Sequence, residues 1–189
     1  MTKIDQSRAW NAYGQAMAAA AGLDLLMKVS NFHDRAIKLV HDARNFEAKR
    51  AKLVEKAMAP HFSQSANEFY ESHIELQSSL FRTALDNAIE FRNYLSHQYF
   101  AAIWPLLSNK EGIDIIECEC SHYKDHFVNV EKHIRSNGNC DFLQFFKQTE
   151  DPNVHVENHP IHRFLTGQVE TIEQALAEAG YPPSDTASE

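Results

Sequence analysis

The chain has 189 residues, of which 43% are hydrophobic, and its formal net charge is −8. This length suits one domain with a sizeable core, and the acidic balance argues against a general nucleic-acid binder, which needs Lys and Arg to neutralise phosphate. No run approaches the roughly 20 apolar residues of a membrane span, the N-terminus lacks a secretory signal, and three cysteines make no disulfide framework. We therefore expect a soluble cytoplasmic protein.

The charge is unevenly distributed along the chain. Residues 28–56 hold eight basic and four acidic residues, whereas residues 141–189 hold nine acidic and two basic ones. The basic segment suits either a surface that faces nucleic acid or an ordinary solvated helix face with alternating charges, and the sequence leaves both readings open.

The first two thirds of the chain predict long helices. Residues 5–28 are rich in Ala, Leu and Met, which favour helices, and residues 30–59 continue the apolar spacing up to Pro60, with no clear sign whether the two segments join. A capping box at Ser65 or Ser72 is expected to start a third helix that runs to about Trp104, just before Pro105.

The remainder predicts an irregular insertion over residues 106–160. Within it, residues 113–120 suit either a strand or a helix, residues 121–135 are expected to be helical up to Asn137-Gly138, and a short helix covers residues 141–147. A final helix starts at Pro160 and ends before Gly180. We predict an all-α helical bundle in one domain, residues 1–180, followed by a disordered tail, residues 181–189.

The most unusual stretch is FRNYLSHQYF, Phe91–Phe100, late in the third helix. At about 100° per residue, Asn93 and His97 face the same way, and Arg92 and Tyr99 differ by only about 20° in projection. A second, apolar side of the helix forms the expected core stripe, which consists of Phe81, Ala84, Ala88, Phe91, Leu95 and Ala102. The helix therefore presents a compact polar cluster beside its apolar face.

This cluster, Arg92-Asn93-x3-His97-x-Tyr99, resembles the Arg-x4-His-x-Tyr motif of the HEPN superfamily of small all-helical proteins. It is most similar to the toxin half of HEPN–nucleotidyltransferase toxin–antitoxin pairs. The resemblance implies a homodimer in which two protomers bring Arg92 and His97 together, and a metal-independent endoribonuclease without a cofactor that acts as a toxin or defence effector. It also implies RNA as substrate and a nucleotidyltransferase antitoxin that modifies Tyr99.

The residue types suit this chemistry. His97 has a reference pKa that allows it to act as general base or acid, and the planar guanidinium of Arg92 suits phosphate oxygens and the charge of a transition state. We assign Asn93, Ser96 and Tyr99 to substrate binding. Because one chain supplies a single imidazole at this motif, a two-fold dimer would provide both acid and base.

Two other interpretations stay open. The first is a non-catalytic helical module that binds a nucleotide or a protein in the same dimer cleft. The second is a zinc-stabilised protein whose ligands come from either of two clusters. These clusters are Cys118, Cys120 and His122, with His126 and Cys140 near in sequence, and His155, His159 and His162. Only one residue separates Cys118 from Cys120, fewer than the two to four typical of structural zinc sites.

Overall fold

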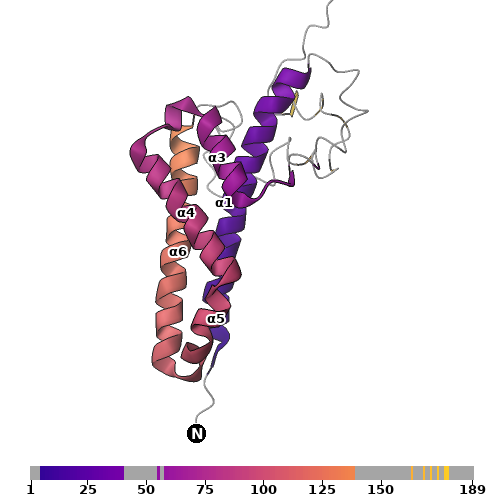
Figure 1. Cartoon of the computed structure of the whole chain (residues 1–189). Helices are drawn as coiled ribbons and strands as arrows, with labels where there is room; N and C mark the ends of the chain where they lie inside the picture. Colours follow the sequence, from indigo (N-terminus) through magenta and orange to yellow (C-terminus); the bar gives the residue numbers. More distant parts are fainter. Residues whose placement is uncertain are drawn as a thin grey trace, which may run out of the picture.

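The structure, a computed structural model, describes residues 5–40 and 58–138 and a few isolated positions elsewhere (Figure 1). These segments form helices and no strand, which confirms the predicted all-α bundle. In chain order the elements are α1 (Ser7–Val40), α3 (Phe62–Ser72), the 3-10 turn η1 (Ile74–Leu76), α4 (Ser79–His97), α5 (Tyr99–Ile103), the 3-10 turn η2 (Trp104–Ser108) and α6 (Lys110–Asn137).

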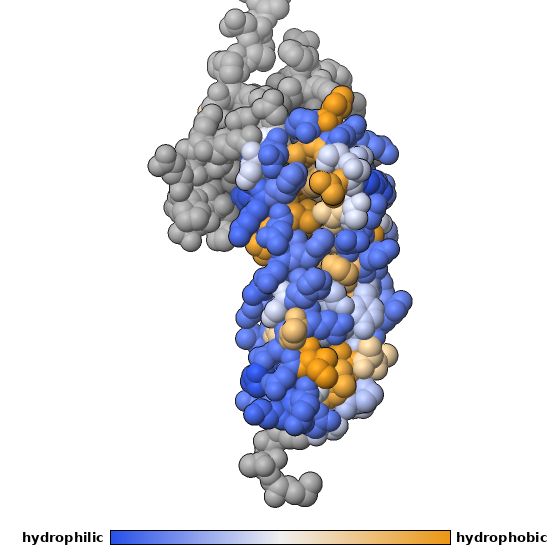
Figure 2. Space-filling model, turned by 90° about the vertical axis from the view of Figure 1, so that its left-hand side faces the viewer, coloured by the Kyte–Doolittle hydropathy of each residue, from blue (hydrophilic) through white to orange (hydrophobic). Residues whose placement is uncertain are grey.

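The two longest helices, α1 and α6, lie side by side and run in the same direction, and α4 packs against them in the opposite direction (Figure 1). Their facing side chains form the core, which includes the fully buried Leu23, Leu26, Leu85, Leu95, Ile116 and Phe127. On the face drawn in Figure 2, hydrophilic residues cover much of the surface and hydrophobic residues show only in patches. Within the described residues, no helix combines the length and hydrophobicity needed to cross a bilayer.

Helix α1 continues without a break through Ser30, which answers the question that the sequence left open. Ser30 and Asn31 are buried polar residues of α1 that contact α3 and the residue that follows it. His73 Nδ1 donates to the Phe69 carbonyl oxygen at 2.8 Å, because a carbonyl oxygen can only accept. His73 Nε2 then accepts from the Ser30 hydroxyl at 3.1 Å. Asn31 Nδ2 donates to the Ser65 carbonyl at 3.1 Å. These bonds join α1 to α3, although Asn31 Oδ1 is buried without a hydrogen-bond partner among the described residues.

The start of α4 differs from the prediction. Ser65 lies inside α3 and Ser72 is its last residue, so neither capping box begins the motif helix. The N-cap is Ser78, which has an extended backbone and whose hydroxyl accepts from the Phe81 N–H at 3.1 Å. The 3-10 turn η1 separates the two helices, and α4 therefore begins at Ser79, later than either box indicates.

Helix α6 covers residues 110–137 and therefore much of the segment, residues 106–160, that the sequence predicts to be irregular. Asn109 caps it by accepting from the Gly112 N–H at 2.7 Å, and the N–H of Gly138 donates to the Ile134 carbonyl at its end. The helix forms because its apolar residues follow a 3.6-residue period and all reach the core: Ile113, Ile116, Cys120, Tyr123, Phe127, Val130 and Ile134. The predicted helix over residues 121–135 is confirmed, whereas the expected elements over 141–147 and 160–180 and the tail lie outside the continuously described residues.

Gly112 allows η2 and α6 to pack closely. It is buried, and a Cβ at this position would overlap the carbonyl oxygen of Leu106. Because backbone atoms cannot rotate out of the way as a flexible side chain can, the close contact requires glycine. The sharp turn from η2 into α6 depends on it.

Gly112→Ala should therefore lower the free energy of unfolding by about 1–3 kcal/mol, the usual range for overpacking. Gly22→Ala is the matched control, because a Cβ there meets its nearest atom, Glu131 Oε2, only at 3.9 Å. Better helix propensity should make that variant about 0.5–1 kcal/mol more stable. Urea unfolding followed by circular dichroism measures both, and equal effects of the two substitutions would contradict this account.

Candidate functional site

Helix α4 is held in place by its apolar face. Phe81, Leu85, Ala88 and Leu95 are buried, and the Phe91 ring lies 4.7 Å from that of Tyr123 on α6. The predicted core stripe is thus largely confirmed, with Ala84 and Phe91 partly buried at its edge, although Ala102 is exposed and the sequence analysis missed Leu85. This anchoring gives the polar side of α4 a rigid base.

Arg92, Asn93 and His97 lie on that polar side and remain accessible. Arg92 is half-buried, and its Nη1 donates to Asn93 Oδ1 at 3.5 Å. It forms no ion pair with any residue that the structure describes. His97, the last residue of α4, is exposed, and its imidazole has no hydrogen bond to the described part of the chain. The site therefore offers a guanidinium without a carboxylate partner and an imidazole without a hydrogen-bond partner among the described residues.

A continuous helix would place Tyr99 on the same side as Arg92, but the structure places it elsewhere. Helix α4 ends at His97, and Gln98, with φ −122° and ψ −26°, separates it from α5. This break turns the Tyr99 side chain inward, where it is 0% exposed. The projection that placed Arg92 and Tyr99 on one stripe fails because it assumed regular helical geometry through residue 98.

The surroundings of Tyr99 are those of a core residue. Its ring stacks on Tyr13 of α1 at 5.7 Å between centroids and meets Tyr94 edge-on at 5.6 Å. Its hydroxyl oxygen accepts from the Cys120 thiol at 3.1 Å. Burial, followed by the contact with Cys120, raises the pKa of Tyr99 far above its ordinary value. Substrate binding and modification at Tyr99, as expected from the motif, do not fit this position, because neither RNA nor an enzyme reaches the hydroxyl in this conformation.

Ser96 also differs from the other polar residues of the motif. Its side chain is half-buried, and its Oγ is enclosed with no hydrogen-bond partner among the described residues. A substrate group would have to enter that space to contact it. The structure thus keeps Arg92, Asn93 and His97 at the surface and separates them from Ser96 and Tyr99.

The first candidate zinc cluster does not assemble. Cys118, Cys120 and His122 lie on α6, where Cys120 points into the core while Cys118 and His122 are exposed. Two residues along a helix turn a side chain by about 200°, so these three cannot share one ion. Within the described residues no group of three or more His, Cys, Asp or Glu side chains is placed to hold a metal. His155, His159 and His162 lie outside the described residues.

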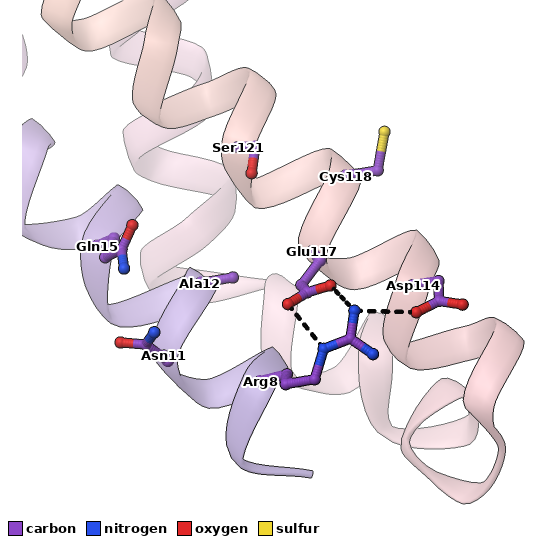
Figure 3. A pocket seen from close by; sticks show the side chains of 8 residues that line it. All are labelled: Arg8, Asn11, Ala12, Gln15, Asp114, Glu117, Cys118 and Ser121. Carbon is purple, nitrogen blue, oxygen red and sulfur yellow. Dashed lines mark hydrogen bonds and ion pairs between the residues drawn. The ribbon is translucent and has the colours of Figure 1, made fainter. Parts of the chain in front are cut away.

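A polar groove of about 470 Å³, which no local sequence pattern indicates, lies between α1 and α6 (Figure 3). Its lining consists of Arg8, Asn11, Ala12, Gln15, Asp114, Glu117, Cys118 and Ser121. The Arg8 guanidinium makes a two-bond contact with the Glu117 carboxylate and reaches Asp114 at 3.2 Å. Because the single guanidinium of Arg8 pairs with two carboxylates, the residues that line the groove offer no unpaired cation to a ligand. Only the fold reveals it, since Arg8 and Glu117 are 109 residues apart.

The tyrosine cluster predicts a dependence of stability on pH. The pKa of Tyr99 is raised in the folded protein by burial, whereas in the unfolded chain it ionises near pH 10. The unfolded state therefore binds fewer protons above pH 10, and stability falls as pH rises. Between pH 9 and 11 the free energy of unfolding should fall by about 1.4 kcal/mol less in Tyr99→Phe than in wild type. Urea titrations at the two pH values test this, and parallel losses in both proteins would contradict it.

Comparisons with known proteins add no further identification. No family model, no curated protein and no solved structure matches this chain. The residues of α4 and the resemblance of their motif are therefore the basis for assigning a function.

Proposed function

We propose that the protein is a metal-independent endoribonuclease of HEPN type, acting as a toxin or defence effector, with a composite site at a two-fold dimer interface. The observation that carries the proposal is the accessibility of Arg92 and His97, which lie on an anchored helix without an acidic partner among the described residues. A guanidinium already paired with a carboxylate, like that of Arg8, would be poorly suited to bind phosphate.

In the proposed reaction, a neutral His97 imidazole removes the proton of a ribose 2′-hydroxyl, and the 2′-oxygen attacks the adjacent phosphorus. The bond from phosphorus to the 5′-oxygen breaks, and an imidazolium returns a proton to that oxygen. The products are a 2′,3′-cyclic phosphate and a 5′-hydroxyl end. Arg92 stabilises the negative charge of the phosphorane, and Asn93, whose side chain is exposed beside it, helps to hold the phosphate.

The geometry of a single helix supports a composite site. His97 lies five positions after Arg92, which turns their side chains about 140° apart around the α4 axis and displaces them by about 7.5 Å along it. The two groups of one chain therefore diverge. A partner chain related by a two-fold axis can place its His97 opposite Arg92, so that cation and imidazole approach one phosphate from different chains.

Two assignments from the motif change in this proposal. Tyr99 and Ser96 are left out of the substrate-binding set because the hydroxyl of the first is buried and that of the second is enclosed. A nucleotidyltransferase antitoxin remains a partner implied by the resemblance. Its modification of Tyr99 would require α5 to leave the core, because Tyr99 lies at its first position.

A second candidate function is a non-catalytic module that binds a nucleotide or a protein at the same surface. The net charge of −8 favours it, since an extended RNA needs several cationic contacts. A mononucleotide would need only Arg92 and a neighbouring donor. Binding of a nucleotide that depends on Arg92, in a protein that leaves RNA uncut, would identify this function.

Arg92→Ala and His97→Ala should each reduce RNA cleavage by about 10²–10⁴-fold. Arg82→Ala and His122→Ala are the matched controls, because Arg82 already pairs with Asp86 at 2.8 Å and His122 lies on α6. Both controls should retain activity. Gel-based cleavage of a labelled RNA measures the rates, while circular dichroism checks that helicity is unchanged. Full activity in either site variant would refute the proposal.

Mixing the two inactive variants tests the composite site. If each site takes Arg92 from one chain and His97 from the other, half of the sites in a mixed dimer keep both residues. Co-refolded Arg92→Ala and His97→Ala chains should then recover cleavage, up to about one quarter of the wild-type rate at random pairing. No recovery in confirmed mixed dimers would rule out this division of labour.

Chelation should leave both folding and RNA cleavage unchanged, since the proposed acid–base chemistry uses only protein groups. The measurement compares cleavage rates and thermal unfolding before and after dialysis against EDTA. Unfolding on metal removal, together with stoichiometric zinc in the untreated protein, would instead support the zinc-stabilised interpretation.

A further inference from the structure

One exposed strip of the first half of α1 is apolar and lies beside the exposed polar residues Asn11 and Gln15. Trp10, Gly14, Ala18 and Ala21 are all exposed, and their spacing of four, four and three residues places them within an arc of about 80°. The opposite side of the same turns is buried in the core, through Ala9, Ala16, Ala20 and Leu23. A surface helix normally carries charged residues on its solvent side, and a helix that is apolar on both sides is normally buried.

Gly14 lies within this strip and leaves it flat. Glycine weakens a helix interior relative to alanine, so its presence there calls for a reason. The chain itself supplies none, because a Cβ built at Gly14 meets no atom within 4 Å. At Gly112, by contrast, the Leu106 carbonyl explains the glycine. The missing side chain at Gly14 therefore suits a close approach from outside the chain.

Exposed aromatic residues extend the strip at one end. The Trp10 ring stacks on Phe100 of α5 at 5.5 Å between centroids, and Phe100 remains 49% exposed. Trp104, about one helical turn further, is 73% exposed. Large aromatic side chains contribute most to protein interfaces when they become buried. The combined surface, here called the α1 face, consists of Trp10, Gly14, Ala18, Ala21, Phe100 and Trp104.

The α1 face carries no charge. Residues 9–23 and 98–109, which supply all six of its members, contain no Asp, Glu, Lys or Arg. A nucleic acid would find no cation on it to neutralise phosphate. Two copies of a chain with a net charge of −8, however, repel each other least where neither presents a charge. Charge thus favours a second copy over RNA as the occupant.

We propose that the α1 face binds the α1 face of a second copy, with the two α1 helices antiparallel and the two-fold axis near Gly14. The face has large residues at one end, Trp10 with Phe100 and Trp104, and small ones at the other. An antiparallel pair places Trp10 of each chain over Ala18 of the partner subunit, so that large side chains meet small ones. Gly14 then faces its own copy, where the absence of a side chain lets the helices come close.

This interface would complete the composite site of the proposed function. Only this role of the dimer in RNA cleavage rests on the proposed function. Tyr13 on α1 donates from its hydroxyl to the Leu95 carbonyl at 3.2 Å, so the last turns of α4 lie beside Gly14. A two-fold axis at Gly14 would bring the Arg92–His97 segments of both chains close to one interface. The dimer itself is argued from the α1 face alone and does not require RNA cleavage.

The first test compares two arginine substitutions by sedimentation velocity at tens of micromolar. Wild type should be dimeric, and Gly14→Arg should raise the dimer dissociation constant by at least about 100-fold, because two charges would be buried at the axis. The open space around Gly14 means that the single chain tolerates the new side chain, so helicity should persist. Asn129→Arg, at an exposed position of α6, is the control and should remain dimeric. A monomeric wild type, or a dimer that Gly14→Arg leaves intact, would overturn the proposal.

A cysteine placed at the axis provides the second test. Gly14→Cys in a Cys118→Ser, Cys140→Ser background should form an intermolecular disulfide on mild oxidation, because residues at a two-fold axis face their own copies within disulfide range. Asn129→Cys in the same background should not. If neither cysteine cross-links, the two-fold axis does not lie at Gly14.

The outcomes separate the two proposals. A wild-type dimer that cross-links at Gly14→Cys but leaves RNA uncut refutes the ribonuclease and leaves the interface standing. A Gly14→Arg monomer that cleaves RNA as fast as wild type leaves the ribonuclease standing and shows that this interface does not complete its site.

Discussion

Tyr99 lies where α1, α4 and α6 meet, and its burial determines the arrangement of the elements around it. Its ring packs against Tyr13 of α1 and Tyr94 of α4, and its hydroxyl accepts from the Cys120 thiol of α6. These contacts require the chain to turn inward immediately after His97, which ends α4 and starts α5. The buried hydroxyl is satisfied by a polar partner, as a hydroxyl in a core must be. The junction between α4 and α5 therefore does two things at once: it ends the motif helix, and it places Tyr99 in the core.

The same junction selects which motif residues remain available for chemistry. Arg92, Asn93 and His97 precede the break and keep the orientation that a straight helix gives them, toward solvent. Tyr99 follows the break and becomes structural. An active site built from the remaining residues depends on charge stabilisation and proton transfer, and both groups stand on a helix fixed by Leu85, Ala88 and Leu95. Rigidity of this kind limits how far the two groups of one chain can converge, which is why a second chain enters the proposed mechanism.

The charged and the uncharged surfaces of the molecule differ in what they can bind. The carboxylates at the start of α6 pair with Arg8 across the groove to α1, and exposed pairs of this kind contribute little to stability. Residues 9–23 of α1 and residues 98–109, which include α5 and η2, carry no charge. Two copies of an acidic chain repel each other least over such a neutral area. The proposed catalytic residues adjoin this area through the contact of Tyr13 with Leu95.

The sequence by itself determined the helical class, most of the apolar stripe of α4 and the placement of Arg92 and His97 off that stripe. These follow from local spacing, because burial of one helix face repeats every 3.6 residues. It could not determine that Ser78 caps α4, since several serines offer the same local signal. It also could not place Tyr99, show that residues 113–120 are helical or pair Arg8 with Glu117. Each of these depends on contacts between residues far apart in the chain, and the free energy of burial decided them only when α1, α4 and α6 packed together.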